Sequence, residues 1–131
     1  MSSVIKFSQA ALIGIHGTIL VAKSEEYLNV VKISELLGAS GHHVAKVMQR
    51  VKKGGFIKSL RGPTGGFKMA KDPAEISLLD IYQAVEGRVF KSEEPKTDIE
   101  KELNENLIKK LTQDFIDYLG KLKLSEAANL S

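Results

Sequence analysis

The stretch NVVKISELLGASGHHVAKVMQRVKKGGFIKSLRGPTGGFKMA, residues 29–70, decides the fold. It predicts a helix over residues 30–37, because Asn29 can cap its first turn and Gly38 suits the left-handed residue that ends many helices. A second helix is predicted over residues 41–53. Two helices joined by a short turn that contains glycine are typical of a helix-turn-helix.

A basic hairpin is predicted directly after the second helix. Residues 56–60 and 66–70 have the composition of two short strands, and the turn over residues 61–65 is rich in glycine. That turn is no phosphate-binding P-loop, because it has no following Lys-Ser/Thr pair and no helix behind it. The hairpin therefore predicts a wing beside the helix-turn-helix.

Three more helices are expected from apolar residues that recur at steps of three and four. The first covers residues 7–23, where Gly14 and Gly17 would permit the close packing of another element. The second covers residues 76–85, with Ser77 as its cap. The third covers residues 98–122 and would measure about 35 Å at 1.5 Å per residue.

The predicted fold is mainly α with a small β-hairpin, a winged helix-turn-helix plus a long C-terminal dimerisation helix. The predicted divisions are a DNA-binding domain at residues 1–87, a linker at 88–97, and the dimerisation helix with its tail at 98–131. We expect the tail from Ala127 to Ser131 to be frayed.

Positive charge is concentrated in one part of the chain. Residues 36–71 contain no Asp or Glu but eight lysines and arginines, whereas the whole chain carries only +3 and its remainder is acidic. A merely solvated basic face would normally contain interspersed acids, so this distribution favours a surface that binds a polyanion such as double-stranded DNA. The residues expected at that surface are Ser40, His42, His43, Lys46, Gln49, Arg50, Lys53, Lys58, Arg61, Gly62, Thr64 and Gly65.

The apolar stripe of the third predicted helix indicates a homodimer. A wing domain this small cannot cover the whole stripe, so a second copy would bury the excess. The alternative is packing within one subunit. The residues assigned to dimerisation are Ile99, Leu103, Leu107, Leu111, Phe115 and Leu119.

No catalytic, metal or cofactor site is predicted. The chain has no cysteine, which excludes disulfides and thiolate ligands. Of its three histidines, His16 is expected to be partly buried, and the side chains of His42 and His43 diverge by about 100° on a helix. With no catalytic site predicted, we expect that the protein is not an enzyme. No stretch resembles a membrane span or a signal peptide, so we expect a cytoplasmic protein.

Two segments resemble the IscR/NsrR/CymR family of bacterial regulators, the Rrf type. They are the run over residues 57–70, IKSLRGPTGGFKMA, and the run over residues 75–87, EISLLDIYQAVEG. The resemblance covers residues 5–87. It implies a homodimeric transcription factor, usually a repressor, that binds an imperfect palindromic operator and whose long C-terminal helix crosses to the partner subunit.

The resemblance also has two departures. Many members hold an iron–sulfur cluster with three cysteines, and residues 88–104 here have none. The chain is therefore similar to the cysteine-free branch, which implies sensing of a small-molecule effector or a partner protein. Ala45 stands where members such as IscR carry Glu, so no operator preference is inferred. The alternative function is a winged-helix protein-interaction adaptor that does not bind DNA.

Overall fold

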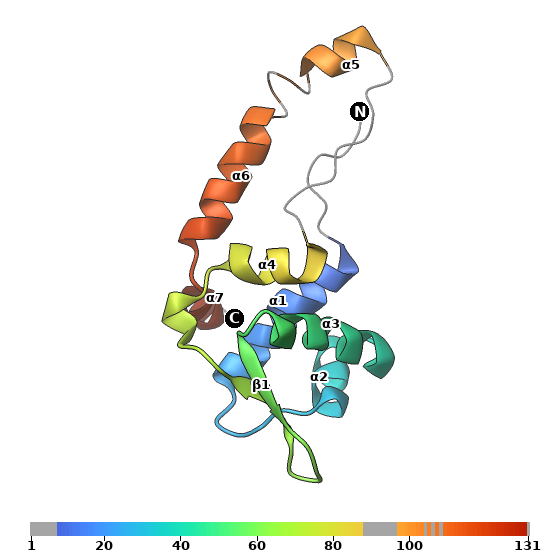
Figure 1. The fold of residues 1–131 in the computed structure, drawn as a ribbon, viewed down its shortest axis with the longest axis vertical. Helices are drawn as coiled ribbons and strands as arrows, with labels where there is room; N and C mark the ends of the chain where they lie inside the picture. Colours follow the sequence, from blue (N-terminus) through green and yellow to red (C-terminus); the bar gives the residue numbers. More distant parts are fainter. Residues whose placement is uncertain (1–7, 88–96, 104, 106, 108, 131) are drawn as a thin grey trace.

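The computed structural model describes residues 8–87, 97–103, 105, 107 and 109–130. Helices dominate it, and a two-stranded antiparallel hairpin follows the third helix (Figure 1). In chain order the elements are α1 (Gln9–Lys23), α2 (Val30–Leu37), α3 (Gly41–Lys53), β1 (Ile57–Leu60), β2 (Gly66–Met69), the 3-10 helix η1 (Pro73–Glu75), α4 (Leu78–Glu86), α5 (Asp98–Leu103), α6 (Lys109–Lys121) and α7 (Leu124–Leu130). The predicted fold class, mainly α with a small hairpin, is confirmed.

The predicted helix-turn-helix is present with the predicted boundaries. The Oδ1 of Asn29 accepts from the Lys32 N–H at 2.8 Å, and the Oγ of Ser40 accepts from the His43 N–H at 3.1 Å. Gly38 ends α2 in the left-handed conformation with φ of 65°. Each cap satisfies a backbone group that a helix end leaves open, so the local sequence sets both helix limits.

Helix α1 lies at the centre of the fold because its glycines let two helices approach closely. A Cβ built on Gly14 would lie 2.6 Å from Val85 Cγ2 of α4, and one on Gly17 would lie 2.8 Å from Met48 Sδ of α3. The close packing expected at both glycines is therefore confirmed. His16 is exposed on the remaining side of α1, so its expected partial burial is wrong.

Leu28, in the loop between α1 and α2, forms an isolated β-bridge with the hairpin. The Leu28 N–H donates to the Phe67 carbonyl at 3.0 Å, and the Phe67 N–H donates to the Leu28 carbonyl at 2.8 Å. Gly66 allows this approach, because a Cβ there would lie 2.5 Å from the Leu28 carbonyl carbon. The pair fixes the wing to the loop between α1 and α2.

The chain after α6 crosses the start of α4. The Leu78 N–H donates to the Leu122 carbonyl at 2.9 Å, and the Leu124 N–H donates to the Ile76 carbonyl at 2.7 Å. Helix α7 follows, with Leu124 0% exposed and Ala127 9% exposed. The frayed tail expected from Ala127 is therefore wrong for residues 127–130, because these apolar side chains, three apart on one helical face, are buried in the core.

The prediction of one continuous α-helix over residues 98–122 is wrong. The structure has two helices, α5 and α6, and Glu105 and Leu107 between them are in π-helical backbone. The greater part of the predicted linker, residues 88–96, lies outside the described residues.

The helices in the described part of the chain include none with the length and apolar character that crossing a lipid bilayer requires.

Candidate nucleic-acid interface

Helix α3 has one buried face and one exposed face. Its buried residues are the predicted stripe of Val44, Val47, Met48 and Val51, each at most 1% exposed. Residues on the other side, His42, Lys46 and Gln49 among them, are exposed, and His43 is half-buried. The apolar stripe therefore fixes the rotation of α3 and turns its polar side chains to solvent.

Ser40 begins this exposed face as the N-cap of α3. Its Oγ accepts the His43 N–H, and Ser40 itself is exposed. A serine hydroxyl that accepts one hydrogen bond still has a proton to donate. Ser40 thus combines a structural role with a free donor at the start of the helix.

The outer face of the hairpin carries two lysines directly opposite each other. In the register of the sheet, Lys58 pairs with Lys68, and like charges placed in this way destabilise a hairpin. The Lys68 Nζ lies 5.3 Å from the centroid of the Tyr27 ring, a cation–π contact that offsets part of this cost.

The wing tip presents Arg61, Gly62 and Thr64 to solvent, but not Gly65. The Gly65 N–H donates to the Gly62 carbonyl at 3.0 Å, and a Cβ on Gly65 would lie 2.0 Å from the Leu60 oxygen. In the structure this glycine closes the turn and its N–H is already used, while the DNA contact predicted at Gly65 stays a prediction. Gly62, with φ of 112° and open space around it, remains a predicted contact.

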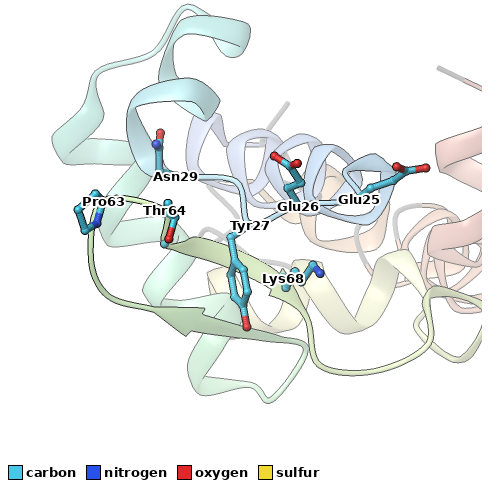
Figure 2. Close-up of a pocket in the computed structure, with 8 residues that line it drawn as sticks. Glu25, Glu26, Tyr27, Asn29, Pro63, Thr64 and Lys68 are labelled. Carbon is cyan, nitrogen blue, oxygen red and sulfur yellow. The ribbon is translucent and has the colours of Figure 1, made fainter.

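A hollow of about 510 Å³ separates the wing from the loop after α1 (Figure 2). Pro63 and Thr64 of the tip line one side of it, Tyr27 and Lys68 lie at its centre, and Glu25 and Glu26 lie toward the far end. The pattern of the sequence did not predict this hollow, because its two walls are more than thirty residues apart. Two carboxylates beside one lysine make it a poor site for a phosphate.

Arg50 differs from the other basic residues of α3. Its Nη1 donates to the Val85 carbonyl of α4 at 3.1 Å. The sequence placed Arg50 among the DNA contacts, whereas the structure commits at least one of its donors to the neighbouring helix. The other basic side chains of this helix face, Lys46 and Lys53, are exposed.

The cations of α3 and the wing tip are not neutralised by the described acids. None of Lys46, Lys53, Lys58 and Arg61 forms an ion pair with an Asp or Glu in the described residues, where the ion pair found is Lys110–Asp114 on α6. That exposed contact, 2.9 Å long, raises the pKa of Lys110 through its hydrogen bond to Asp114. The hairpin extends from one end of the molecule beside α3, and α5 and α6 extend from the other (Figure 1).

The residues assigned to dimerisation fall into two groups. Ile99, Leu107 and Leu111 are 73%, 49% and 50% exposed in the single chain. Leu119 is instead 4% exposed, and Phe115 is half-buried with its ring 6.3 Å from that of Tyr82 in an edge-on contact. Packing within one subunit, the alternative considered for the stripe, therefore holds for Phe115 and Leu119. The side chain of Leu103 lies outside the described residues.

Comparison with known proteins gives a family match over most of the chain. The model of the Rrf2 family, described as "Iron-dependent Transcriptional regulator", matches residues 7–129. The transcriptional regulator YwgB of Bacillus subtilis (strain 168) is 45% identical over 56 residues, which are 43% of this chain and 36% of YwgB. The transcriptional regulator NsrR of Geobacillus kaustophilus (strain HTA426) is 36% identical over 62 residues, 47% of this chain and 42% of NsrR. The matched segments thus span about two fifths of the length of these relatives.

The fold is also similar to that of solved structures. The structure of CymR, "the Global Cysteine Regulator of B. subtilis", aligns with a TM-score of 0.82 at 22% identity, over 97% of this chain and 98% of that chain. At this identity the likeness concerns the fold. It extends beyond the winged-helix part, because nearly the whole of both chains is aligned.

The residues of this chain do not fit a cluster of the kind that three cysteines hold. The sequence contains no cysteine, and the described residues contain no group of three His, Cys, Asp or Glu placed to hold a metal ion. The family description names iron, and the described residues of this chain provide no such group of ligands for it. With a matching model over residues 7–129 and a winged helix of the corresponding fold, the chain belongs to the Rrf2 family of transcriptional regulators.

Proposed function

We propose that this protein is a sequence-specific DNA-binding regulator of transcription. The observation that supports this most strongly is the set of exposed cations on α3 and the wing tip, which form no ion pair with an acid of the described residues. The hairpin that carries the tip extends from the end of the molecule opposite α5 (Figure 1). A protein-interaction adaptor would have no need of an acid-free stretch over residues 36–71. Phosphates of a duplex are the partners that such a surface attracts.

In the proposed complex α3 enters the major groove, which is wide enough for an α-helix. Ser40, His42, His43 and Gln49 are the side chains assigned to base edges. Lys46, Lys53 and Lys58 are assigned to phosphates, which position the protein without selecting a sequence. Arg61, Gly62 and Thr64 bring the wing tip to the backbone or the minor groove, where arginine is favoured when the groove is narrow.

The regulator is proposed to act as a homodimer through the exposed stripe of α5 and α6. Leu111 and Tyr118 of α6, seven residues apart and 50% and 65% exposed, share one helical face, and Leu107, 49% exposed, precedes this helix. A second copy related by a two-fold axis would cover this stripe. The two copies of α3 would then face half-sites about one helical turn, or a multiple of it, apart on a palindromic operator.

The proposal also covers regulation and domain organisation. We expect the protein to act as a repressor whose DNA binding is controlled by a small-molecule effector or a partner protein. The division into a DNA-binding domain at residues 1–87, a linker at 88–97 and a dimerisation segment at 98–131 is part of the same proposal.

The first experiment removes the wing-tip cation. Arg61→Ala should weaken binding at least tenfold to a duplex recovered from random DNA by the purified protein, while the protein keeps its folded, dimeric state. The affinity should fall because the variant loses a charge that lies in or beside a DNA groove, and a gel-shift titration measures that affinity. Lys109→Ala on α6 is the matched control and should leave affinity unchanged. Equal affinities of Arg61→Ala and wild type would remove the wing from the mechanism.

Salt dependence gives an independent check. If each subunit neutralises about four phosphates, a dimer neutralises about eight, and the affinity should fall with roughly the seventh power of salt concentration. A slope near zero would contradict phosphate contact by this surface.

A further inference from the structure

The contact between Arg50 and Val85 connects the helix that we place in the major groove to α4. Val85 lies in the last turn of α4, where backbone carbonyls lack a partner within the helix. The Arg50 Nη1 donates to this carbonyl at 3.1 Å. A cation is also favoured at the C-terminal end of a helix, where the helix dipole is negative. The contact therefore satisfies a carbonyl that α4 itself leaves open.

Arg50 contacts α4 at the edge of a hollow. This hollow, of about 490 Å³, lies between the ends of α3 and α4 and is lined by Arg50, Lys53 and Gly54 on one side and by residues 84–87 on the other. Beside it, Val51 of α3 and Val85 of α4 belong to one buried core cluster, so core packing holds the two helices together. The guanidinium of Arg50 adds a hydrogen bond at the exposed edge of this packed contact.

Helix α4 is in turn fixed to α6. Tyr82 is 1% exposed, and its ring meets that of Phe115 at 6.3 Å and 78°. Gly120 of α6 also lies beside α4, where a Cβ built on it would be in ordinary contact with Leu79 Cδ2 at 3.7 Å. A continuous set of contacts thus runs from α6, through α4, to Arg50 on α3. In a dimer formed through α6, this set would determine the angle between the two copies of α3.

We propose that Arg50 is a positioning residue, which fixes α3 relative to α6, and that it is not chiefly a phosphate contact. This inference rests on the proposed function. A duplex with two half-sites requires both copies of α3 in register, so its binding depends on that angle. Binding to unrelated sequence depends mainly on phosphate charge, so it does not.

The test compares Arg50→Met with Lys53→Met. Both residues lie in the last turn of α3, and methionine retains most of the aliphatic stem while it removes charge and donors. Affinities are measured at several salt concentrations for the duplex selected from random DNA and for a scrambled duplex of the same length. Stoichiometric titration with DNA and thermal melting correct for any inactive fraction.

We expect Arg50→Met to weaken binding to the selected duplex about tenfold, the equivalent of one lost hydrogen bond to a charged group. Its salt slope and its affinity for the scrambled duplex should equal those of wild type. Lys53→Met should instead weaken binding to both duplexes and lower the slope by about two per dimer, because each subunit loses one phosphate contact.

The outcomes separate this inference from the proposed function. A reduced slope for Arg50→Met, with weaker binding to both duplexes, would make Arg50 a phosphate contact and overturn the inference alone. Wild-type affinity of Arg50→Met for both duplexes would also overturn it. If the wild-type protein binds no duplex, the proposed function fails and the inference with it.

Arg50→Lys carries the same test if Arg50→Met does not fold. Lysine keeps the charge but replaces the planar guanidinium with a single ammonium group. The positioning role predicts weaker binding to the selected duplex at an unchanged slope. Wild-type behaviour on both duplexes would instead favour a phosphate contact and overturn the inference.

Discussion

Helices α1 and α6 are of similar length but differ in how they are buried. Eight of the 15 residues of α1 are buried, among them Ile13, Ile15 and Ile19. Only Thr112 and Leu119 are buried among the 13 residues of α6, although α6 has a clear apolar stripe. The rest of the chain thus buries most of α1. It covers only one face of α6 and leaves Leu111 and Tyr118 exposed. The difference indicates that α6, unlike α1, has a surface suited to a second copy.

The largest expected effect on the free energy of unfolding comes from truncating an apolar side chain to alanine in α1, compared with the same change in α6. Ile15 is 6% exposed, so Ile15→Ala should lower the free energy of unfolding by about 2–5 kcal/mol through lost burial and a cavity. Leu111 is 50% exposed, so Leu111→Ala should change the unfolding of the single subunit much less. Urea unfolding at low protein concentration compares the two. Equal losses would contradict the distinction between the two helices.

A charge on the exposed stripe should weaken self-association next. Leu111→Asp places a carboxylate in the proposed apolar interface, where it has no partner, and should raise the dissociation constant of the dimer at least tenfold, about 1.4 kcal/mol. Sedimentation velocity over a concentration series measures this. Lys109→Asp, on the opposite face of α6, is the control and should leave association unchanged. A dimer that tolerates Leu111→Asp would place the interface elsewhere.

The smallest expected effect concerns two helix caps. Ser77 and Asp80 form a capping box at the start of α4, so Ser77→Ala should lower the free energy of unfolding by about 1 kcal/mol. The Thr97 Oγ1 accepts the Glu100 N–H at 3.0 Å at the start of α5, where the described side chains are exposed or half-buried. Thr97→Ala should therefore leave global unfolding unchanged in thermal melts. A comparable loss at Thr97 would show that α5 belongs to the cooperative core of one subunit.

The helix-turn-helix could be predicted to the residue because its limits depend on neighbouring side chains. Asn29 and Ser40 cap helices through atoms three residues away, and Gly38 adopts its left-handed conformation locally. The bridge between Leu28 and Phe67 depends instead on two residues that are far apart in sequence. A bridge made by one residue leaves no alternating pattern, so no local signal predicts it.

The C-terminal segment, residues 98–131, was predicted less well for a related reason. A periodic stripe shows which residues share a face, but it does not show whether that face packs on the same chain. Phe115 and Leu119 pack within the subunit while Leu111 remains exposed, although all three belong to one stripe. The candidate site shows the same limit, because the residue type alone does not reveal the partner. Arg50 has a side chain suited to a phosphate contact, yet its Nη1 donates to the Val85 carbonyl.

A hydroxyl-radical footprint of the protein on its selected duplex tests the central claim most directly. If α3 and the wing of two subunits lie against DNA, each strand should show protected patches related by a two-fold axis and spaced by about one helical turn or a multiple of it. A duplex cleaved uniformly along its length in the presence of saturating protein would contradict the account.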